Sequence, residues 1–208
     1  MLTAPSRVYG SALLDSSRWN DFVFRPDDIC VCTYQKAGTT WVQNIVLHLI
    51  FQDLQVRNIP AFSPFFELRG MPVADLTGTL AAQQHRRCIK SHVALDGITF
   101  NSEASYIVVG RDPRDIAMSL WNFYRNFKDV YFVATGVPGI APLPRPPDDF
   151  HDFWQSWIAR GSLGRRTAIP SGRVSTTPRP GGRRGTGPMS ISCISTICCP
   201  TSRGNWIG

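Results

Sequence analysis

The spacing of apolar and polar residues along this chain predicts short strands followed by helices. Residues 29–33 form an apolar, β-branched run with the composition of a buried strand. A tight polar turn follows. Apolar residues then return at the i, i+3, i+4 spacing of an amphipathic helix, at Val42, Ile45, Val46, Leu49 and Ile50. The first unit is therefore a strand, a small polar loop and a helix.

Two more strands and two more helices are predicted downstream. Residues 88–92 form a short strand that ends in polar residues, and residues 105–110 are a β-branched run with room for burial on both faces. A helix then starts at Asp112, a good N-cap followed by proline. Its predicted apolar face comprises Ile116, Leu120, Phe123 and Phe127. The last helix, at 150–158, has an aromatic face that we expect to pack inward, made of Phe150, Phe153, Trp154 and Trp157.

The loop after the first strand has the features of a phosphate-binding site. Loop N–H groups and a helix N-terminus point at an anion in such a loop, and Lys36 adds a mobile positive charge. Gly38 lets the backbone approach the anion closely. The strict nucleotide-triphosphate loop, G-x-x-x-x-G-K-[ST], is absent, because no glycine lies five residues before Gly38 and the lysine precedes it.

Polar residues at the end of the second predicted strand belong to the same region. Ligands in open α/β sheets bind at the carboxyl ends of strands. Lys90 and His92 stand at that end of the strand at 88–92. If this strand lies beside the one at 29–33, both side chains lie near the loop of Lys36.

Composition narrows the class of protein. The chain has 208 residues, enough for one α/β domain, and a formal net charge of +7. All acidic residues lie in 1–160, which is formally neutral, so the excess charge comes from arginines in 161–208. A uniformly basic protein would indicate nucleic acid, and we expect no nucleic-acid partner here. No apolar run approaches the roughly 20 residues of a membrane span, so no span is expected.

The cysteines and the N-terminus indicate the cellular setting. The six cysteines show no metal-binding spacing, and no metal is expected. The N-terminus lacks a basic segment followed by an apolar core, so we see no signal peptide. A reduced, cytoplasmic localisation is the default.

Three motifs together resemble the cytosolic-type sulfotransferases, which use 3′-phosphoadenosine 5′-phosphosulfate (PAPS) as donor. The loop at 33–41, T-Y-Q-K-A-G-T-T-W, resembles the family's T-Y-P-K-S-G-T-T-W and departs from it at Gln35 and Ala37. Residues 89–92, I-K-S-H, resemble I-K-[ST]-H, and residues 111–119 resemble R-D-P-[KR]-D-x-x-x-S. The resemblance covers residues 7–160. It implies an α/β, three-layer sandwich with a central parallel sheet, P-loop-like as in nucleotide kinases, and incomplete at the C-terminus.

The resemblance also implies a role for each site residue. His92 would be the catalytic base that takes the acceptor's proton. Lys36 would stabilise charge on the leaving phosphate, and Lys90 would support the sulfuryl oxygens. Trp41 would stack near the adenine, and Arg111 with Ser119 would bind the 3′-phosphate. The whole donor-binding set is Lys36, Ala37, Gly38, Thr39, Thr40, Trp41, Arg111 and Ser119, and the scheme requires no metal.

The acceptor is less well defined by the sequence. Residues 52–87 are cut by prolines and lack a clean period, and this region lines the acceptor pocket in the family. Its aromatic residues, Phe62, Phe65 and Phe66, fit a small lipophilic acceptor, although plain core packing explains them equally well. The sequence leaves open whether the protein forms a homodimer.

The character of the chain changes after residue 160. Residues 161–208 contain nine Gly, five Pro and no acidic residue, and they show no apolar period. Disorder is the thermodynamic default for such a segment. If the codons of residues 192–208 are read in a frame that starts one base earlier, they can encode a sequence beginning F-L-H-F-N-D-L. This sequence resembles the family's downstream strand. We therefore expect a sulfotransferase domain at 1–160 and a low-complexity basic tail that is disordered or out of frame.

These observations predict a sulfotransferase that moves a sulfuryl group from PAPS to a hydroxyl or amine of a small acceptor. One alternative is a catalytically impaired, truncated sulfotransferase-like protein, because the family's late R-K-G-x-x-G-D-W-K element is missing from the sequence. A P-loop nucleotide kinase is the weaker alternative, since it should show a full Walker loop and a Mg²⁺-binding carboxylate after a strand.

Overall fold

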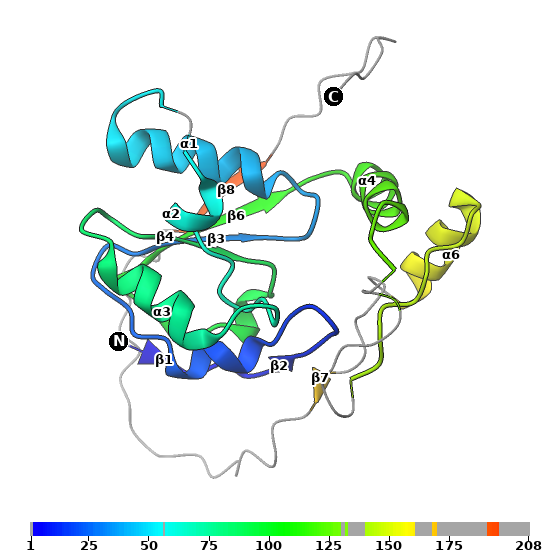
Figure 1. Ribbon diagram of the computed structural model, residues 1–208, viewed down its shortest axis with the longest axis horizontal. Helices are drawn as coiled ribbons and strands as arrows, with labels where there is room; N and C mark the ends of the chain where they lie inside the picture. The colour runs from blue at the N-terminus through cyan, green and yellow to red at the C-terminus, as the bar shows by residue number, and fades with distance from the viewer. Residues whose placement is uncertain are drawn as a thin grey trace.

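The computed structural model describes residues 2–55, 57–129, 132, 140–160, 168–169 and 191–195. Its centre is a four-stranded sheet in the order β4-β3-β6-β8, in which every neighbouring pair is parallel (Figure 1). The strands are β3 (Ile29–Thr33), β4 (Cys88–Ser91), β6 (Ser105–Gly110) and β8 (Ile191–Ser195). The strand at 88–92 is thus a direct neighbour of the first strand, as the site prediction requires.

Helices cover both faces of this sheet. Helix α1 (Thr39–Phe51) lies on one face, and the 3₁₀ helix η1 (Ser16–Asp21) and helix α3 (Val73–Ala82) lie on the other (Figure 1). Successive side chains of a strand point to opposite faces. Val31 accordingly packs in the cluster under α1, whereas Cys30 and Cys32 pack in the cluster that holds Trp19. The predicted three-layer α/β arrangement is confirmed.

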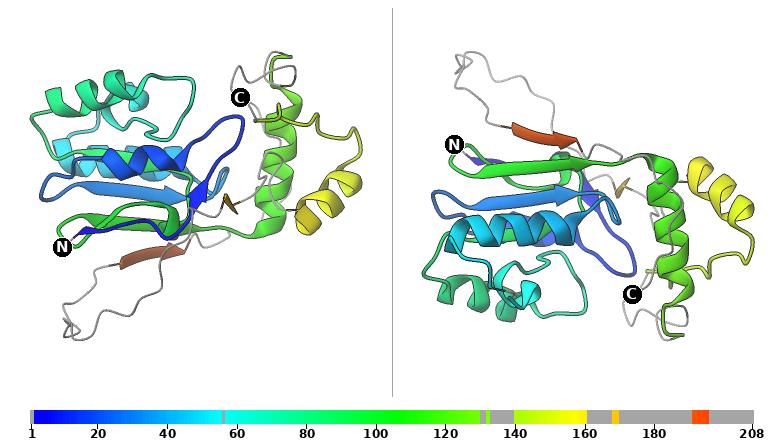
Figure 2. Two further views of the ribbon diagram at one scale, coloured as in Figure 1. Left: turned by 90° about the horizontal axis from the view of Figure 1, so that it is seen from below. Right: turned by 90° about the horizontal axis from the view of Figure 1, so that it is seen from above.

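Two further helices lie beyond the carboxyl ends of the strands. Figure 2 shows α4 (Pro113–Arg125) and α6 (Phe150–Arg160) side by side there. Leu120 and Tyr124 of α4 share a buried cluster with Phe153 of α6. The predicted aromatic face of the last helix is confirmed, because its other members, Phe150, Trp154 and Trp157, pack against the same cluster.

The remaining elements are short. Strands β1 (Leu2–Thr3) and β5 (Phe100–Asn101) pair antiparallel, as do β2 (Val8–Tyr9) and β7 (Ala168–Ile169). Helix α2 (Ile59–Phe62) and the 3₁₀ helix η2 (Leu95–Gly97) complete the set. Over the described ranges, no helix combines the length and the apolar character needed to cross a bilayer.

Two predicted helix faces need correction. On α1, Val42 and Val46 are buried as predicted, but Leu49 is 70% exposed and Leu47 takes the next buried position. On α4, Ile116 and Leu120 are buried, but Tyr124 rather than Phe123 continues the buried stripe. The apolar spacing is compatible with either buried face on each helix. Packing against the sheet and α6 selected the face with Leu47 on α1 and the face with Tyr124 on α4.

Most of the segment at 161–208 lies outside the described residues. Strands β7 and β8 are the parts of it that the structure describes, and β8 pairs with β6 from Tyr106 to Gly110. The disordered or out-of-frame tail stays a prediction.

Candidate active site

The phosphate-binding loop joins the end of β3 to the start of α1. Gly38 is the N-cap of α1 and has a φ of 109°, a left-handed conformation that favours glycine. Nothing lies within 4 Å of a Cβ built there, so the backbone angle rather than crowding requires glycine. Lys36 also has a positive φ of 63°, a conformation that costs a lysine about 1–2 kcal/mol. The backbone of this loop is therefore fixed in an unusual shape at Lys36 and Gly38.

Side-chain and turn hydrogen bonds hold the loop in that shape. The buried hydroxyls of Thr33 and Thr39 lie 2.5 Å apart and connect the end of β3 to the start of α1. The Ala37 N–H donates to the Tyr34 carbonyl at 3.1 Å, and the Ala37 side chain is buried. Ala37 is thus the one member of the predicted donor-binding set that does not line the cavity described next.

A cavity of about 650 Å³ opens at the carboxyl ends of β3, β4 and β6. It brings together residues from all three sequence motifs, which come from the β3–α1 loop, the end of β4 and the β6–α4 connection. Those that line it are Lys36, Gly38, Thr39, Thr40, Trp41, Lys90, His92, Arg111 and Ser119. The predicted juxtaposition of Lys90 and His92 with the loop of Lys36 is therefore present in the fold.

The His92 ring has a defined tautomer. Its Nδ1 atom lies 2.9 Å from the Thr33 carbonyl oxygen, and a carbonyl can only accept a hydrogen bond. Nδ1 therefore carries the proton and donates, which leaves Nε2 as the unprotonated nitrogen. Burial, with a contribution from the nearby Lys90 charge, lowers the pKa of His92 to about 3. The imidazole is neutral at physiological pH and has the form that a general base requires.

The two lysines of the cavity rest on aromatic rings. Lys36 Nζ lies 4.5 Å from the centroid of the Phe123 ring, and Lys90 Nζ lies 4.4 Å from that of Phe65. A ring face stabilises an ammonium at this distance without neutralising it. Burial lowers the pKa of Lys90, and the Lys36 charge adds to that effect. The cavity thus concentrates positive charge in a partly desolvated place, which suits an anionic ligand.

Arg111 connects the third motif to the loop. Its Nη1 donates to the Lys36 carbonyl at 3.0 Å, and its Nε lies 3.7 Å from Asp115. Asp112 accepts from the Arg114 N–H at 2.8 Å and caps α4, as predicted. Ser119 lies on the next turns of the same helix and faces the cavity. The cap therefore fixes the start of the helix that carries Ser119.

Sequence reasoning missed several residues of the cavity. Its apolar side is formed by Leu13, Phe65, Leu68, Phe123 and Phe127, and Gln35 lies beside the loop. Phe123, which we predicted to pack in the core, is 41% exposed at this surface. Of the aromatic residues that the sequence analysis named, Phe65 lines the cavity, whereas Phe66 is fully buried. Gln35, one of the two departures from the family motif, accepts a 3.0 Å hydrogen bond from Tyr124 of α4.

The described part of the chain contains no group of three or more His, Cys, Asp or Glu side chains arranged to hold a metal ion. Among the described residues that line the cavity there is no Asp or Glu; its ionisable side chains are Lys36, Lys90, His92 and Arg111.

Comparison with known proteins identifies the family. Residues 26–166 match the sulfotransferase domain, so the chain belongs to the sulfotransferase domain family. It is 40% identical over 162 residues to a glycolipid sulfotransferase of Mycobacterium tuberculosis (strain ATCC 25177 / H37Ra), which covers 71% of this chain and 50% of that protein. It is 34% identical over 147 residues to sulfotransferase 1A1 of Canis lupus familiaris, covering 67% of this chain and 45% of that protein. The chain spans about half the length of the curated relatives it matches.

The fold has a solved counterpart as well. Mouse sulfotransferase SULT7A1 complexed with PAP superposes with a TM-score of 0.53 at 18% identity, over 78% of this chain and 52% of that one. This likeness supports the parallel-sheet fold.

Proposed function

We propose that this chain transfers a sulfuryl group from PAPS to a hydroxyl or amine of a small acceptor. The observation that carries the proposal is the hydrogen bond from His92 Nδ1 to the Thr33 carbonyl, which leaves Nε2 free as a base in a cavity lined by Lys36, Lys90 and Arg111. A base beside a cationic, loop-and-helix anion site is the arrangement that this reaction needs.

The residues present fit the donor. Two phosphates and a sulfuryl group need several positive charges and hydrogen-bond donors. Thr39, Thr40 and the loop N–H groups at the start of α1 would hold the 5′-phosphate. Arg111 and Ser119 would hold the 3′-phosphate, and Trp41, 59% exposed at the cavity, would stack near the adenine. In support, the mouse relative was solved with PAP.

The chemistry assigned to the chain's own residues is a proton transfer with charge stabilisation. The bound phosphosulfate supplies the sulfuryl group and a phosphate leaving group. Nε2 of His92 takes the proton of the acceptor hydroxyl as the acceptor oxygen bonds to sulfur. The Lys36 ammonium stabilises the charge that develops on the phosphate oxygen whose bond to sulfur breaks, and Lys90 faces the sulfuryl oxygens. The donor's negative charge would raise the pKa of His92 and strengthen the base when it is needed.

The acceptor side of the cavity favours a lipophilic molecule. Five apolar side chains form it, at Leu13, Phe65, Leu68, Phe123 and Phe127. An apolar wall with few polar groups is typical of sites for small apolar ligands. The proposal also includes three further points. Residues 1–160 form the catalytic unit, the protein is cytoplasmic, and catalysis needs no metal.

Binding of three nucleotides that differ in their phosphates tests the proposal. Isothermal titration calorimetry should show that adenosine 3′,5′-bisphosphate binds more tightly than adenosine 5′-monophosphate and more tightly than ATP. Equal affinity for the three would contradict the assignment of Arg111 and Ser119 to a 3′-phosphate.

A further inference from the structure

We infer that Glu67 is a positioning residue, whose buried carboxyl group fixes the main chain of His92. The inference rests on the proposed function, because it concerns the base of that reaction. Glu67 is fully buried, and sequence reasoning assigned it no role. Its Oε1 accepts hydrogen bonds from the His92 N–H at 2.5 Å and from Ser91 Oγ at 2.8 Å, and its Oε2 accepts one from Trp19 Nε1 at 3.2 Å.

The bond to His92 replaces a backbone bond of the sheet. Residues 64–66 run parallel to β4, since the Lys90 N–H donates to the Pro64 carbonyl and the Phe66 N–H donates to the Lys90 carbonyl. In a continued parallel ladder, the His92 N–H would donate next to the Phe66 carbonyl. The Glu67 carboxylate takes that hydrogen bond instead. A bond to an ionised acceptor is shorter and stronger than one between neutral groups, so the base is tied more firmly than the ladder alone would tie it.

The same segment also holds the ring of His92. Phe65, two residues before Glu67, lies edge-on to the imidazole with ring centroids 4.9 Å apart and an interplanar angle of 75°. The ring is thus restrained by Phe65 and by the Thr33 carbonyl, and the main chain by Glu67. Three contacts, two from residues 65–67 and one from the end of β3, therefore converge on one base.

The partners of Glu67 indicate a carboxylate rather than a carboxylic acid. The indole N–H of Trp19 and the amide of His92 can only donate. The Ser91 hydroxyl accepts from the Val93 N–H, which turns its own proton toward Glu67. Burial raises the pKa of Glu67 above its ordinary value, and these hydrogen bonds offset only part of that rise. The ionised form satisfies all three donors without adding a proton that would need an acceptor of its own.

The buried charge acts on Lys90 as well. Burial lowers the pKa of Lys90, and the Glu67 charge opposes that shift. Lys36 and His92 are the charged or titratable groups that face Lys90 from the cavity, and neither adds negative charge. On its other sides Glu67 faces Arg18, Cys30 and Cys32.

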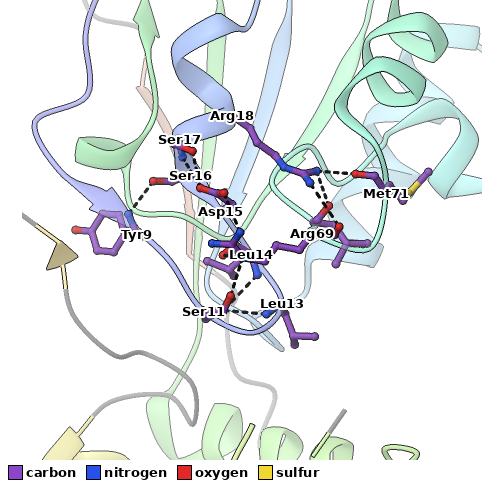
Figure 3. A network of polar contacts seen from close by, with 11 residues as sticks. Tyr9, Ser11, Leu13, Leu14, Asp15, Ser16, Ser17, Arg18, Arg69 and Met71 are labelled. Atoms are coloured by element: carbon purple, nitrogen blue, oxygen red, sulfur yellow. Dashed lines mark hydrogen bonds and ion pairs between the residues drawn. The ribbon is translucent and has the colours of Figure 1, made fainter. Parts of the chain in front are cut away.

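A second network keeps the Glu67 segment in place. Figure 3 shows Arg18 and Arg69 joining residues 11–18 to residues 68–71. Arg69 pairs with Asp15 at 2.9 Å, and Arg18 Nη1 donates to the carbonyls of Leu68 and Met71 at 2.6 and 2.9 Å. The Asp15 N–H also donates to the Glu67 carbonyl. Glu67 is therefore presented from an anchored segment, which a positioning role requires.

The test compares Glu67→Gln with Ser91→Ala. The amide of Glu67→Gln retains an acceptor for His92 but has no charge, whereas Ser91→Ala removes one bond to the same carboxylate and keeps its charge. Each variant is assayed by transfer of radiolabelled sulfuryl from PAPS to 2-naphthol. We expect Glu67→Gln to lower kcat at least tenfold, with the Kd for adenosine 3′,5′-bisphosphate changed less than threefold. Ser91→Ala should change kcat less than threefold.

Two results would overturn the inference. One is a Glu67→Gln kcat within twofold of the wild type. The other is a loss of nucleotide binding that equals the loss of kcat, which would mean that Glu67 only supports folding. If Glu67→Gln does not fold, NMR of the wild type decides: the His92 amide proton should be shifted downfield of the other β4 amides and protected from exchange. A wild type that transfers no sulfuryl group would refute the proposed function, while that amide signal would still test the placement of Glu67.

Discussion

The Nδ1 atom of His92 lies 2.9 Å from the carbonyl oxygen of Thr33. The last residue of β3 therefore fixes the imidazole ring that comes directly after the neighbouring strand, β4. Because the carbonyl accepts, the ring proton is confined to Nδ1 and Nε2 is left to act as a base. The order of the sheet therefore sets the tautomer of the residue to which we assign proton transfer. Loop and base are held together by the same strand end, since Thr33 also contacts Thr39 of the phosphate-binding loop.

The buried neutral state of His92 should make stability depend on pH. Its pKa is lowered to about 3 in the folded chain, against about 6.5 for histidine in an unfolded chain. Between these values the unfolded chain binds a proton that the folded chain does not, so folding stability falls as the pH falls. His92→Asn removes this term and should lose less stability than the wild type between about pH 7 and pH 5 in urea unfolding. Identical losses would contradict the lowered pKa.

Lys36 should matter for both donor binding and turnover. Its ammonium is proposed to contact the donor in the ground state and the leaving oxygen in the transition state. Lys36→Ala should therefore weaken binding of adenosine 3′,5′-bisphosphate about tenfold or more and lower kcat by a larger factor. The control is Lys128→Ala, which removes an exposed lysine outside the cavity and should leave both quantities unchanged. Calorimetry and the transfer assay measure the two effects separately.

Arg111 should determine the preference for a 3′-phosphate. Arg111→Ala should reduce the ratio of affinities for adenosine 3′,5′-bisphosphate and adenosine 5′-monophosphate about tenfold, because one charged hydrogen-bonding partner of the extra phosphate is lost. Arg114→Ala is the matched control three residues away, at the start of α4, since Arg114 pairs with Asp112 and does not line the cavity. A ratio that is unchanged in Arg111→Ala would place the 3′-phosphate elsewhere.

A buried ion pair at the start of β3 should dominate the stability of the sheet edge. Arg87 Nε donates to Asp28 at 2.7 Å, and Arg87 Nη2 also donates to the Val23 carbonyl at 3.0 Å. Arg87→Ala leaves the Asp28 charge buried and unpaired, so unfolding should become easier by about 3–5 kcal/mol. Its exposed neighbour provides the control, and Arg86→Ala should cost less than about 1 kcal/mol. Comparable losses in the two variants would show that the pair is not a dominant contribution.

The sequence was sufficient to predict most of the polar residues that line the cavity, because its signals are local. The run at 29–33, the turn at Lys36 and Gly38, and the polar end of the strand at 88–92 each follow from short-range pattern. The rule that ligands bind at the carboxyl ends of parallel strands then brings them together. The fold confirms the strands, the loop and the layers that these patterns predict.

The features that the sequence did not predict depend on long-range packing: the role of Glu67, the buried faces of α1 and α4, and strand β8. Glu67 bonds to residues 24 and 25 positions away, from a proline-cut stretch in which no period can be recognised. The periods of α1 and α4 allowed two choices of buried face, and contacts with the sheet and α6 decided between them. Strand β8 arises in a segment whose composition indicates no regular structure, and its pairing with β6 supplies hydrogen bonds that no local pattern specifies.

Transfer of sulfuryl from PAPS to 2-naphthol by the wild type and by His92→Ala is the most direct measurement of the central claim. The wild type should form the sulfated product, and His92→Ala should lower kcat by about 10²–10⁴, the contribution typical of a well-placed general base. The Kd of His92→Ala for adenosine 3′,5′-bisphosphate should stay within about threefold of the wild type, because the base acts on the acceptor. A wild type that binds the bisphosphate but forms no product, or a His92→Ala variant with normal turnover, would contradict the account.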